Sequence, residues 1–244
     1  MLSEAGEMDD DFPSKHVSWG GACRLIPSRF PPVELYEPVA DQKDREALKA
    51  LETLTNPRLS PDGGAGDFLR PDDRHVTQPW LVAPFAYLDP EPTLYSDGSY
   101  GVCIVAETEK GALAAAVQRR EAFMRATAMP PTRLDMRQLV TPVSATLHDI
   151  TGWQRVGDST ETRRICQKLR EQGSYGVLLA SPFRVGESTA VLFRPTAMTR
   201  ATQAKHYCFV WDGSRISGIY DYSDQTEQTF DPATLITTEA RVAA

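Results

Sequence analysis

The sequence lacks the patterns that would assign a function directly. It has no Walker phosphate-binding loop and no GxGxxG, and the glycines at 63, 64 and 66 lack the lysine of a phosphate loop. No stretch interleaves aromatic with basic residues as a nucleic-acid platform does. No run approaches the roughly 20 apolar residues that span a bilayer, and the acidic N-terminus lacks the basic and apolar regions of a signal peptide. We therefore expect a cytoplasmic protein with no membrane partner.

Cysteine is scarce and widely spaced. The four residues form neither a CxxC pair nor a metal-binding pattern: Cys23, Cys103, Cys166 and Cys208. Each lies in or beside an apolar run, as a buried free thiol does. We therefore expect a reduced compartment, buried thiols and no bound metal.

The composition is that of an ordinary globular protein, with 41% hydrophobic and 24% charged residues. At 244 residues the chain can bury one sizeable core, and nothing demands a second domain. The net charge of −7 argues against nonspecific binding to nucleic acid or to anionic membranes. An acidic surface would instead suit a basic protein partner.

The most informative stretch is residues 93–124, which predicts a turn, a strand and a helix in succession. Residues 96–98, Ser-Asp-Gly, are a turn signal. Residues 100–106 are apolar or small without clean alternation, which indicates a short strand covered on both faces. Capping residues follow, and apolar residues at helical spacing predict a helix over 111–124.

The rest of the chain predicts short elements of both kinds. Amphipathic helices are expected at about 41–55 and 158–172, and residues 80–87 look like a buried segment broken by Pro84. The expected strands are 23–26, 134–139, 144–150 and 176–180, followed by a hairpin of 206–211 and 214–222 around Asp212-Gly213.

These elements predict an α+β fold: a single domain with mostly antiparallel sheets and about three main helices. We divide the chain into a flexible acidic N-terminal segment (1–21), the domain (22–222) and a loosely attached C-terminal tail (223–244). The apolar pair at 235–236 could still add one contact from the tail.

Several motifs, in order along the chain, resemble the RES-domain family of NAD-consuming toxins. They are RLIPSRFPP, LTNPRL, SDGSYGV, GVLLASPF and WDGSRI. The resemblance covers about residues 22–222 and implies an ADP-ribosyltransferase-like arrangement with an NAD cleft between its sheets. It also implies a helix-turn-helix antitoxin as partner, with a homo-oligomer as a further expectation.

The resemblance assigns candidate site residues. Arg24 and Ser181 stand where the family places the arginine and the serine of its name, and would hold the phosphates or a ribose of NAD. Tyr100 and Arg184 are further candidates for contact with the nucleotide. The alternatives from the residues alone are a structural salt bridge for Arg24 and a local turn cap for Ser181.

Three family positions are replaced in this chain. The arginine before the Ser-Asp-Gly turn is Leu94, the glutamate inside the following helix is Ala115, and the histidine one turn later is Arg119. Near Ser181 the Val-Arg of the family has become Pro-Phe, which moves the arginine to Arg184. When a family member loses its catalytic side chains, we expect several of them to be replaced together by apolar residues. Removing one member of a buried polar group would leave the charge of its partner uncompensated.

Two functions of different class therefore remain. One is a RES-like pseudoenzyme, weakened or inactive, that still binds a nucleotide or a protein partner. The alternative is an active NAD-cleaving enzyme of the phosphorylase, glycohydrolase or ADP-ribosyl transferase type, working with a re-registered set of residues. The sequence favours the first, because Ala115 cannot stabilise a positively charged transition state.

Overall fold

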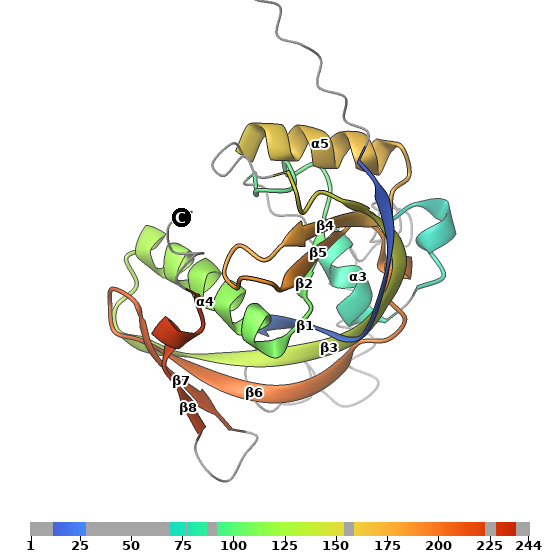
Figure 1. Ribbon diagram of the computed structural model, residues 1–244. Coiled ribbons are helices and arrows are strands. Elements are labelled where there is room, and N and C mark those ends of the chain that lie inside the picture. The colour runs from blue at the N-terminus through green and yellow to red at the C-terminus, as the bar shows by residue number, and fades with distance from the viewer. Residues whose placement is uncertain are drawn as a thin grey trace, which may run out of the picture.

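A single strongly curved sheet organises the molecule (Figure 1). The computed structural model describes residues 12–27, 69–76, 78–86, 92–153, 159–222 and 228–237. The strands are β1 (Ser14–Pro27), β2 (Cys103–Ala106), β3 (Thr132–Asp149), β4 (Gly176–Ala180), β5 (Ser188–Leu192), β6 (Thr202–Trp211), β7 (Ile216–Asp221) and β8 (Gln228–Phe230). The helices are α3 (Pro79–Ala86), α4 (Glu109–Ala126) and α5 (Ser159–Glu171), with 3-10 turns η1 (Pro71–Asp73), η2 (Pro195–Ala197) and η3 (Pro232–Thr234).

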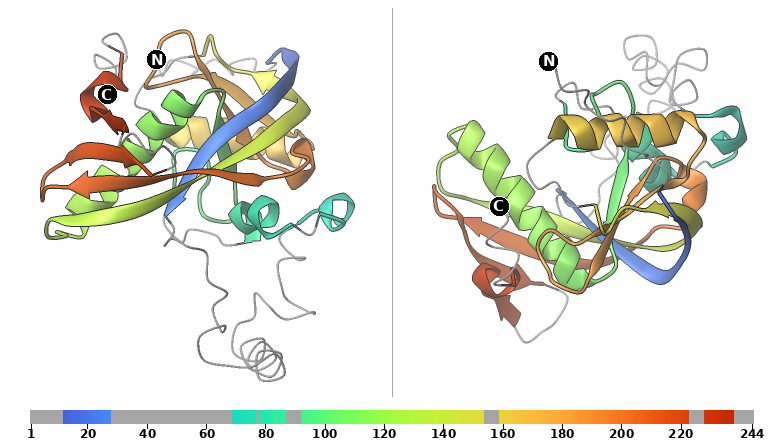
Figure 2. Two further views of the ribbon diagram at one scale, coloured as in Figure 1. Left: turned by 90° about the horizontal axis from the view of Figure 1, so that it is seen from below. Right: turned by 45° about the horizontal axis from the view of Figure 1, so that its top comes forward.

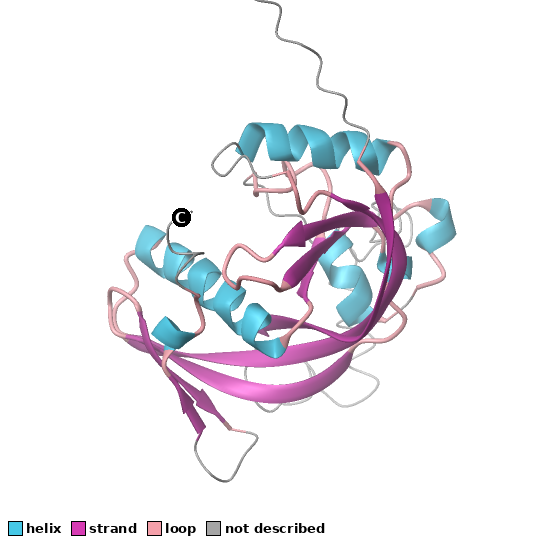
Figure 3. Cartoon of the chain, in the orientation of Figure 1, coloured by secondary structure: helices cyan, strands magenta, loops and turns pink. Residues whose placement is uncertain are grey.

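Part of the sheet closes into a ring. The strand order is β1-β2-β5-β4-β3-β6-β7-β8, and β1 also pairs with β3 along nearly its whole length. The pairing of β1 with β2, β2 with β5, β5 with β4 and β4 with β3 completes the circuit. All pairs are antiparallel except β3 with β4. The strands β6, β7 and β8 continue outward from β3 as a ribbon (Figure 3).

Four apolar clusters fill the described part of this framework, and the smallest of them joins Cys23 of β1, Ala106 of β2 and Ala112 of α4. An interior cluster inside the ring includes Val17, Ala22, Cys103, Val105, Val143, Leu147, Leu178 and Leu192, with Leu81 and Phe85 of α3. An α4 cluster joins that helix to the outer ribbon and includes Leu113, Val117, Met124, Met136, Tyr207, Phe209, Trp211, Ile219 and Leu235. An α5 cluster includes Tyr95, Tyr100, Ile165, Leu169, Val177 and Phe193. Figure 2 shows α4 and α5 over different parts of the sheet.

The helix α4 confirms the strongest sequence prediction. Thr108 is its N-cap, and the Thr108 hydroxyl accepts a hydrogen bond from the Gly111 N–H at 3.0 Å. Leu113, Ala116, Val117 and Met124 face the α4 cluster as expected. Phe123, which was also expected in the core, is 52% exposed, because it lies next to Met124 and so points to another side of the helix. The helix extends two residues beyond the predicted 111–124 at each end. Likewise, α5 lies within one residue of the predicted 158–172.

The expectation of two strands between residues 134 and 150 is wrong, because β3 is one continuous strand. Pro142 lies between the two expected strands, and a proline cannot donate to a ladder. The structure accommodates it with a bulge: Val143 pairs with Trp19 and Thr141 with Ala22, so two glycines of β1 stand opposite the single Pro142. Because β3 continues beyond Pro142 to Asp149, β1 can pair with it as far back as Ser14. The strand β1 thus begins well before residue 22, the predicted start of the ordered domain.

The segment that contains Pro84 is also more regular than expected. Instead of being broken at that residue, α3 runs from Pro79 to Ala86 with Pro84 inside it. A proline there removes the hydrogen bond of its own N–H and crowds the carbonyl four residues earlier, so the helix needs support from elsewhere. Leu81 and Phe85 are buried in the interior cluster, and this packing holds the helix together.

Close packing of α3 against the chain before β2 yields a stability prediction at Gly101. A Cβ atom at this position would lie 2.2 Å from the Pro84 carbonyl oxygen and 2.6 Å from the Phe85 Cα. We expect Gly101→Ala to lower the free energy of unfolding by about 1–3 kcal/mol, because both obstructing atoms are backbone. Urea denaturation measures this, with Gly152→Ala as the control, since a Cβ there meets nothing within 4 Å. Equal midpoints for the two variants would contradict this account.

The chain ends differ from their predicted boundaries. The expected loose tail instead adds β8 to β7, and Leu235 is buried in the α4 cluster. The apolar contact expected at 235–236 is therefore present.

The predicted helix at 41–55 and the LTNPRL motif lie outside the described residues, as does the first part of the N-terminal segment. The hairpin around Asp212 is confirmed, and the Asp212 carboxylate accepts from the Ser214 and Arg215 N–H groups.

Candidate functional site

Ser181 begins the loop between β4 and β5, which we call the site loop (residues 181–187). Its backbone N–H donates to the Glu187 carbonyl at 2.8 Å, which closes the base of the loop. Its hydroxyl oxygen accepts from the N–H groups of Phe183 and Arg184, at 3.4 and 3.2 Å. Ser181 therefore caps a local turn, and its hydroxyl still carries a proton that it can donate.

Glu187 ties the site loop to the beginning of α4. One carboxylate oxygen accepts from the Thr108 hydroxyl at 2.5 Å, and the other pairs with the Arg184 guanidinium. The second of these contacts is a charge-assisted bond between two partly buried side chains. A Cβ at Gly111 would lie 3.0 Å from the Glu187 carboxylate, so this glycine leaves room for it in the first turn of the helix.

The C-terminal residues contact the same loop. The Thr237 N–H donates to the Phe183 carbonyl at 3.1 Å, and the Val185 N–H donates to the Thr237 hydroxyl at 3.0 Å. The Arg184 guanidinium donates to the Leu235 carbonyl at 3.0 Å. Arg184, expected as a nucleotide contact, is therefore shared between Glu187 and the C-terminal segment.

Arg24 lies near the C-terminal end of β1, half-buried, on the face that also carries Ala22. Its guanidinium donates to the Cys103 sulfur at 3.2 Å, at the edge of the interior cluster. Ser181 bonds within its own loop, so these two expected site residues share no hydrogen-bond partner in the described part of the chain. The salt bridge that was the alternative expectation for Arg24 is not among its contacts there.

Tyr100 is a core residue under α5. It is 5% exposed, and its hydroxyl donates to the Tyr95 carbonyl at 2.8 Å. The Arg170 guanidinium carbon lies 4.6 Å from the ring centroid, and Phe193 packs edge-on against the ring. Burial raises the pKa of Tyr100 above its ordinary value, so the phenol stays protonated.

The three positions that the family resemblance predicts to be replaced lie on two separate segments. Leu94 is 47% exposed beside the Ser-Asp-Gly turn, Ala115 is half-buried on α4, and Arg119 is exposed one turn further along. The nearest later acid on α4, Glu121, is used elsewhere. It accepts from the Ile216 N–H at 2.7 Å and from Arg125 at 2.6 Å, which anchors the start of β7.

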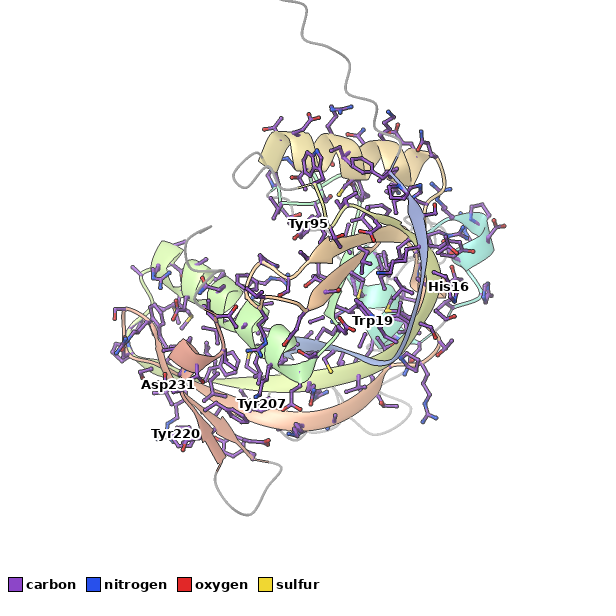
Figure 4. All side chains as sticks on the ribbon, in the orientation of Figure 1. His16, Trp19, Tyr95, Tyr207, Tyr220 and Asp231 are labelled. Atoms are coloured by element: carbon purple, nitrogen blue, oxygen red, sulfur yellow. The ribbon has the colours of Figure 1, made fainter. Side chains whose placement is uncertain are left out.

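A polar network at the start of α4 was not predicted from the sequence. Glu109 accepts from the Tyr207 hydroxyl at 2.5 Å and from the Lys205 ammonium at 2.9 Å. Lys205 also contacts the buried Asp221 at 3.3 Å. Figure 4 shows Tyr207 on β6 below α4. Alternation along β6 could have placed Lys205 and Tyr207 on one face, but nothing in the sequence pairs them with Glu109.

The electrostatics of this network follow from burial and pairing. Burial, followed by the bond to Glu109, raises the pKa of Tyr207. The bond to Glu109 raises the pKa of Lys205, so the ammonium stays charged. Nearby, burial raises the pKa of the Cys23 thiol. Tyr207, Lys205 and Cys23 are therefore protonated. The hydrogen bonds of Tyr207 and Lys205 with Glu109 attach the start of α4 to β6.

The cysteines match their prediction, since all four are free and buried. Within the described residues, no three histidine, cysteine or acidic side chains gather as a metal ion would require. None of the helices in the described ranges is both long and apolar enough to cross a membrane.

Comparisons with known proteins place the chain in a family. The family model described as the RES domain matches residues 71–212, more than half of the chain. The uncharacterized protein y4oC of Sinorhizobium fredii is 38% identical over 201 residues, which are 82% of this chain and 87% of that protein. A chain in the crystal structure of the M. tuberculosis MbcT–MbcA toxin-antitoxin complex matches with a TM-score of 0.37 and 11% identity, over 93% of this chain and 92% of that chain.

The fold described above is a single α+β domain built on a mostly antiparallel sheet, as expected. The chain belongs to the RES-domain family.

Proposed function

We propose that this RES-domain protein binds NAD or a related dinucleotide and cleaves the nicotinamide–ribose bond slowly or not at all. The observation that carries the proposal is Ala115. It stands half-buried on α4, where the family resemblance places a glutamate. Binding and cleavage depend on different groups, so the first can persist without the second.

The chemistry explains why Ala115 matters. Breaking the bond between nicotinamide and ribose passes through an oxocarbenium-like centre, and the ADP-ribosyl group then goes to phosphate, water or a protein. A preorganised carboxylate stabilises that positive charge, and removing one such group lowers the rate by about 10²–10³. Glu109 and Glu121 are engaged in structural contacts, and Glu107 accepts from the Ser188 N–H.

For binding, the proposal assigns Arg24, Ser181 and Arg184. A guanidinium suits a phosphate because it offers planar, permanently charged donors. The Ser181 hydroxyl has a proton to donate to a ribose or phosphate oxygen. The Tyr100 hydroxyl donates to the Tyr95 carbonyl inside the core. We therefore assign Tyr100 a structural role in the turn before β2 and no direct contact with the nucleotide.

One observation favours the second candidate, an active enzyme. The Glu187 carboxylate lies against Gly111, which is one helical turn before Ala115. A carboxylate from the site loop would then stand in for the one missing from the helix. Its pairing with Arg184 neutralises much of that charge, which is why we rank this candidate second.

The partner proposed from the family resemblance is a protein antitoxin, and self-association is the alternative. The acidic net charge of −7 suits a basic partner surface. We assign no metal to the site, and we propose the cytoplasm as the compartment.

Calorimetric titration with NAD, run beside a long NAD-consumption assay with and without phosphate, tests the proposal. The variant is Arg24→Ala and the matched control is Arg200→Ala, an exposed arginine outside the candidate site. We expect binding that Arg24→Ala weakens by at least about tenfold, the loss of one charged contact, while turnover stays negligible. Absence of binding would overturn the nucleotide assignment, and rapid consumption that depends on Arg24 would establish the enzyme instead.

A further inference from the structure

The C-terminal segment passes beside α4 to reach the site loop. Figure 1 shows η3 next to that helix, and the chain continues from η3 to the contacts of Leu235 and Thr237. The segment is anchored on its other side by β8, which pairs with β7. Asp231, labelled in Figure 4, caps η3 by accepting from the Ala233 N–H at 2.9 Å. The segment is therefore held at both ends.

Residues 235–237 accept hydrogen bonds from site-loop N–H groups that would otherwise be available to an anionic ligand. The Leu235 carbonyl takes one N–H of Arg184, and the Thr237 hydroxyl takes the Val185 N–H. Phe183 packs in the α4 cluster with Leu235 and Ile236, so apolar contacts between the loop and the C-terminal segment lie beside these hydrogen bonds. Both donors are the kinds that bind phosphate in proteins, a guanidinium and a backbone N–H.

We propose that residues 235–237 form an autoinhibitory strap that competes with the dinucleotide for the site loop. The inference rests on the proposed function, because it assigns regulation to the same site. A phosphate offers Arg184 two charged oxygens in place of one neutral carbonyl, so a bound dinucleotide and the closed strap exclude each other. The strap belongs to the same chain, so its effective concentration at the loop is high and it weakens ligand binding at every protein concentration.

The first experiment compares NAD titrations of the unmodified chain and of Thr237→Val. This change keeps the shape of the side chain and removes the acceptor of the Val185 N–H. We expect tighter binding by about 2–10-fold, the worth of one hydrogen bond, and faster hydrogen exchange at the Val185 amide. Thr234→Val is the matched control. It is exposed, its hydroxyl donates to the Asp231 carbonyl at 2.8 Å, and we expect it to leave the affinity unchanged.

A second variant locks the strap closed. Val185→Cys with Thr237→Cys places two thiols where the backbone nitrogen of one residue lies 3.0 Å from the hydroxyl of the other, and the four native cysteines are buried. We expect the oxidised form to bind NAD at least about tenfold more weakly than the reduced form, with full recovery on reduction. This comparison uses one folded protein in two redox states, so it does not depend on the stability of the strap variants.

The outcomes separate the two proposals. Equal affinities for the unmodified chain, Thr237→Val and both redox states would overturn the strap and leave dinucleotide binding intact. Failure of every form to bind NAD, including the reduced double variant, would overturn dinucleotide binding and with it the strap. Tighter binding by Thr237→Val together with a redox-dependent loss supports both.

Discussion

Restoring the family side chains, with Leu94→Arg, Ala115→Glu and Arg119→His in one protein, is expected to raise NAD consumption by about 10²–10³-fold over the unmodified chain. The reason is that the introduced carboxylate and imidazole, four residues apart, would share one face of α4. Ala115 is half-buried and Arg119 exposed, so the new carboxylate would be partly shielded from water, where its charge acts more strongly. The measurement is the rate of NAD loss with purified protein at saturating NAD.

A control with the same charge isolates the position of the carboxylate. Leu94→Arg, Ala122→Glu and Arg119→His keep the composition of the restored variant but place the glutamate on the exposed residue two turns further along α4. We expect this control to remain inert. If the restored variant binds NAD and is equally inert, then the assignment of these three positions, or the account of what the site lacks, is wrong.

Removing the buried carboxylate in Asp73→Ala is expected to lower the free energy of unfolding by about 3–5 kcal/mol. Asp73 is 1% exposed and accepts from the Arg194 guanidinium at 3.0 Å and from the Thr196 hydroxyl at 2.5 Å. The Arg194 side chain is only 12% exposed, so the substitution leaves a charge with little water around it and without its carboxylate. Chemical denaturation monitored by tryptophan fluorescence measures the loss.

The neighbouring aspartate provides the matched control. Asp72 is exposed in the same turn η1, and we expect Asp72→Ala to change the free energy of unfolding by less than about 0.5 kcal/mol. Replacing both partners, in Asp73→Leu with Arg194→Met, should be less damaging than Asp73→Ala alone, because no buried charge is left behind. A double variant as unstable as the single one would show that the contacts of Arg194 with Tyr175, rather than its pairing with Asp73, hold this region.

Local patterns predicted the regular elements well. The Thr108 cap and the apolar spacing that follows it located α4, and Asp212-Gly213 located the hairpin of β6 and β7. These signals succeed because capping, helical periodicity and tight turns involve residues close in sequence. Local patterns failed for the single strand β3, predicted as two strands, and at Pro84, because a bulge opposite Pro142 and core packing around α3 keep both elements continuous.

The candidate site was predicted only in part. The resemblance selected Ser181 and Arg184, but it gave no reason to include Glu187, whose partner Thr108 lies 79 residues away in the sequence. It also missed the contact between Arg184 and the Leu235 carbonyl, 51 residues apart. Single residues in loops carry no periodic signal, so their partners can be found only when the chain is folded.

The sequence by itself determined the α+β class, the two long helices, the closing hairpin and the buried thiols, whereas the replacement of three family side chains stays a prediction from the resemblance. The tertiary structure alone decided that β1 and β3 close the sheet into a ring, that Tyr100 is a core residue and that Leu235 and Thr237 hydrogen-bond to the site loop. The physical reason is one of range. Propensity, capping and periodicity act over a few residues, whereas strand pairing and the satisfaction of polar groups depend on which distant segments meet.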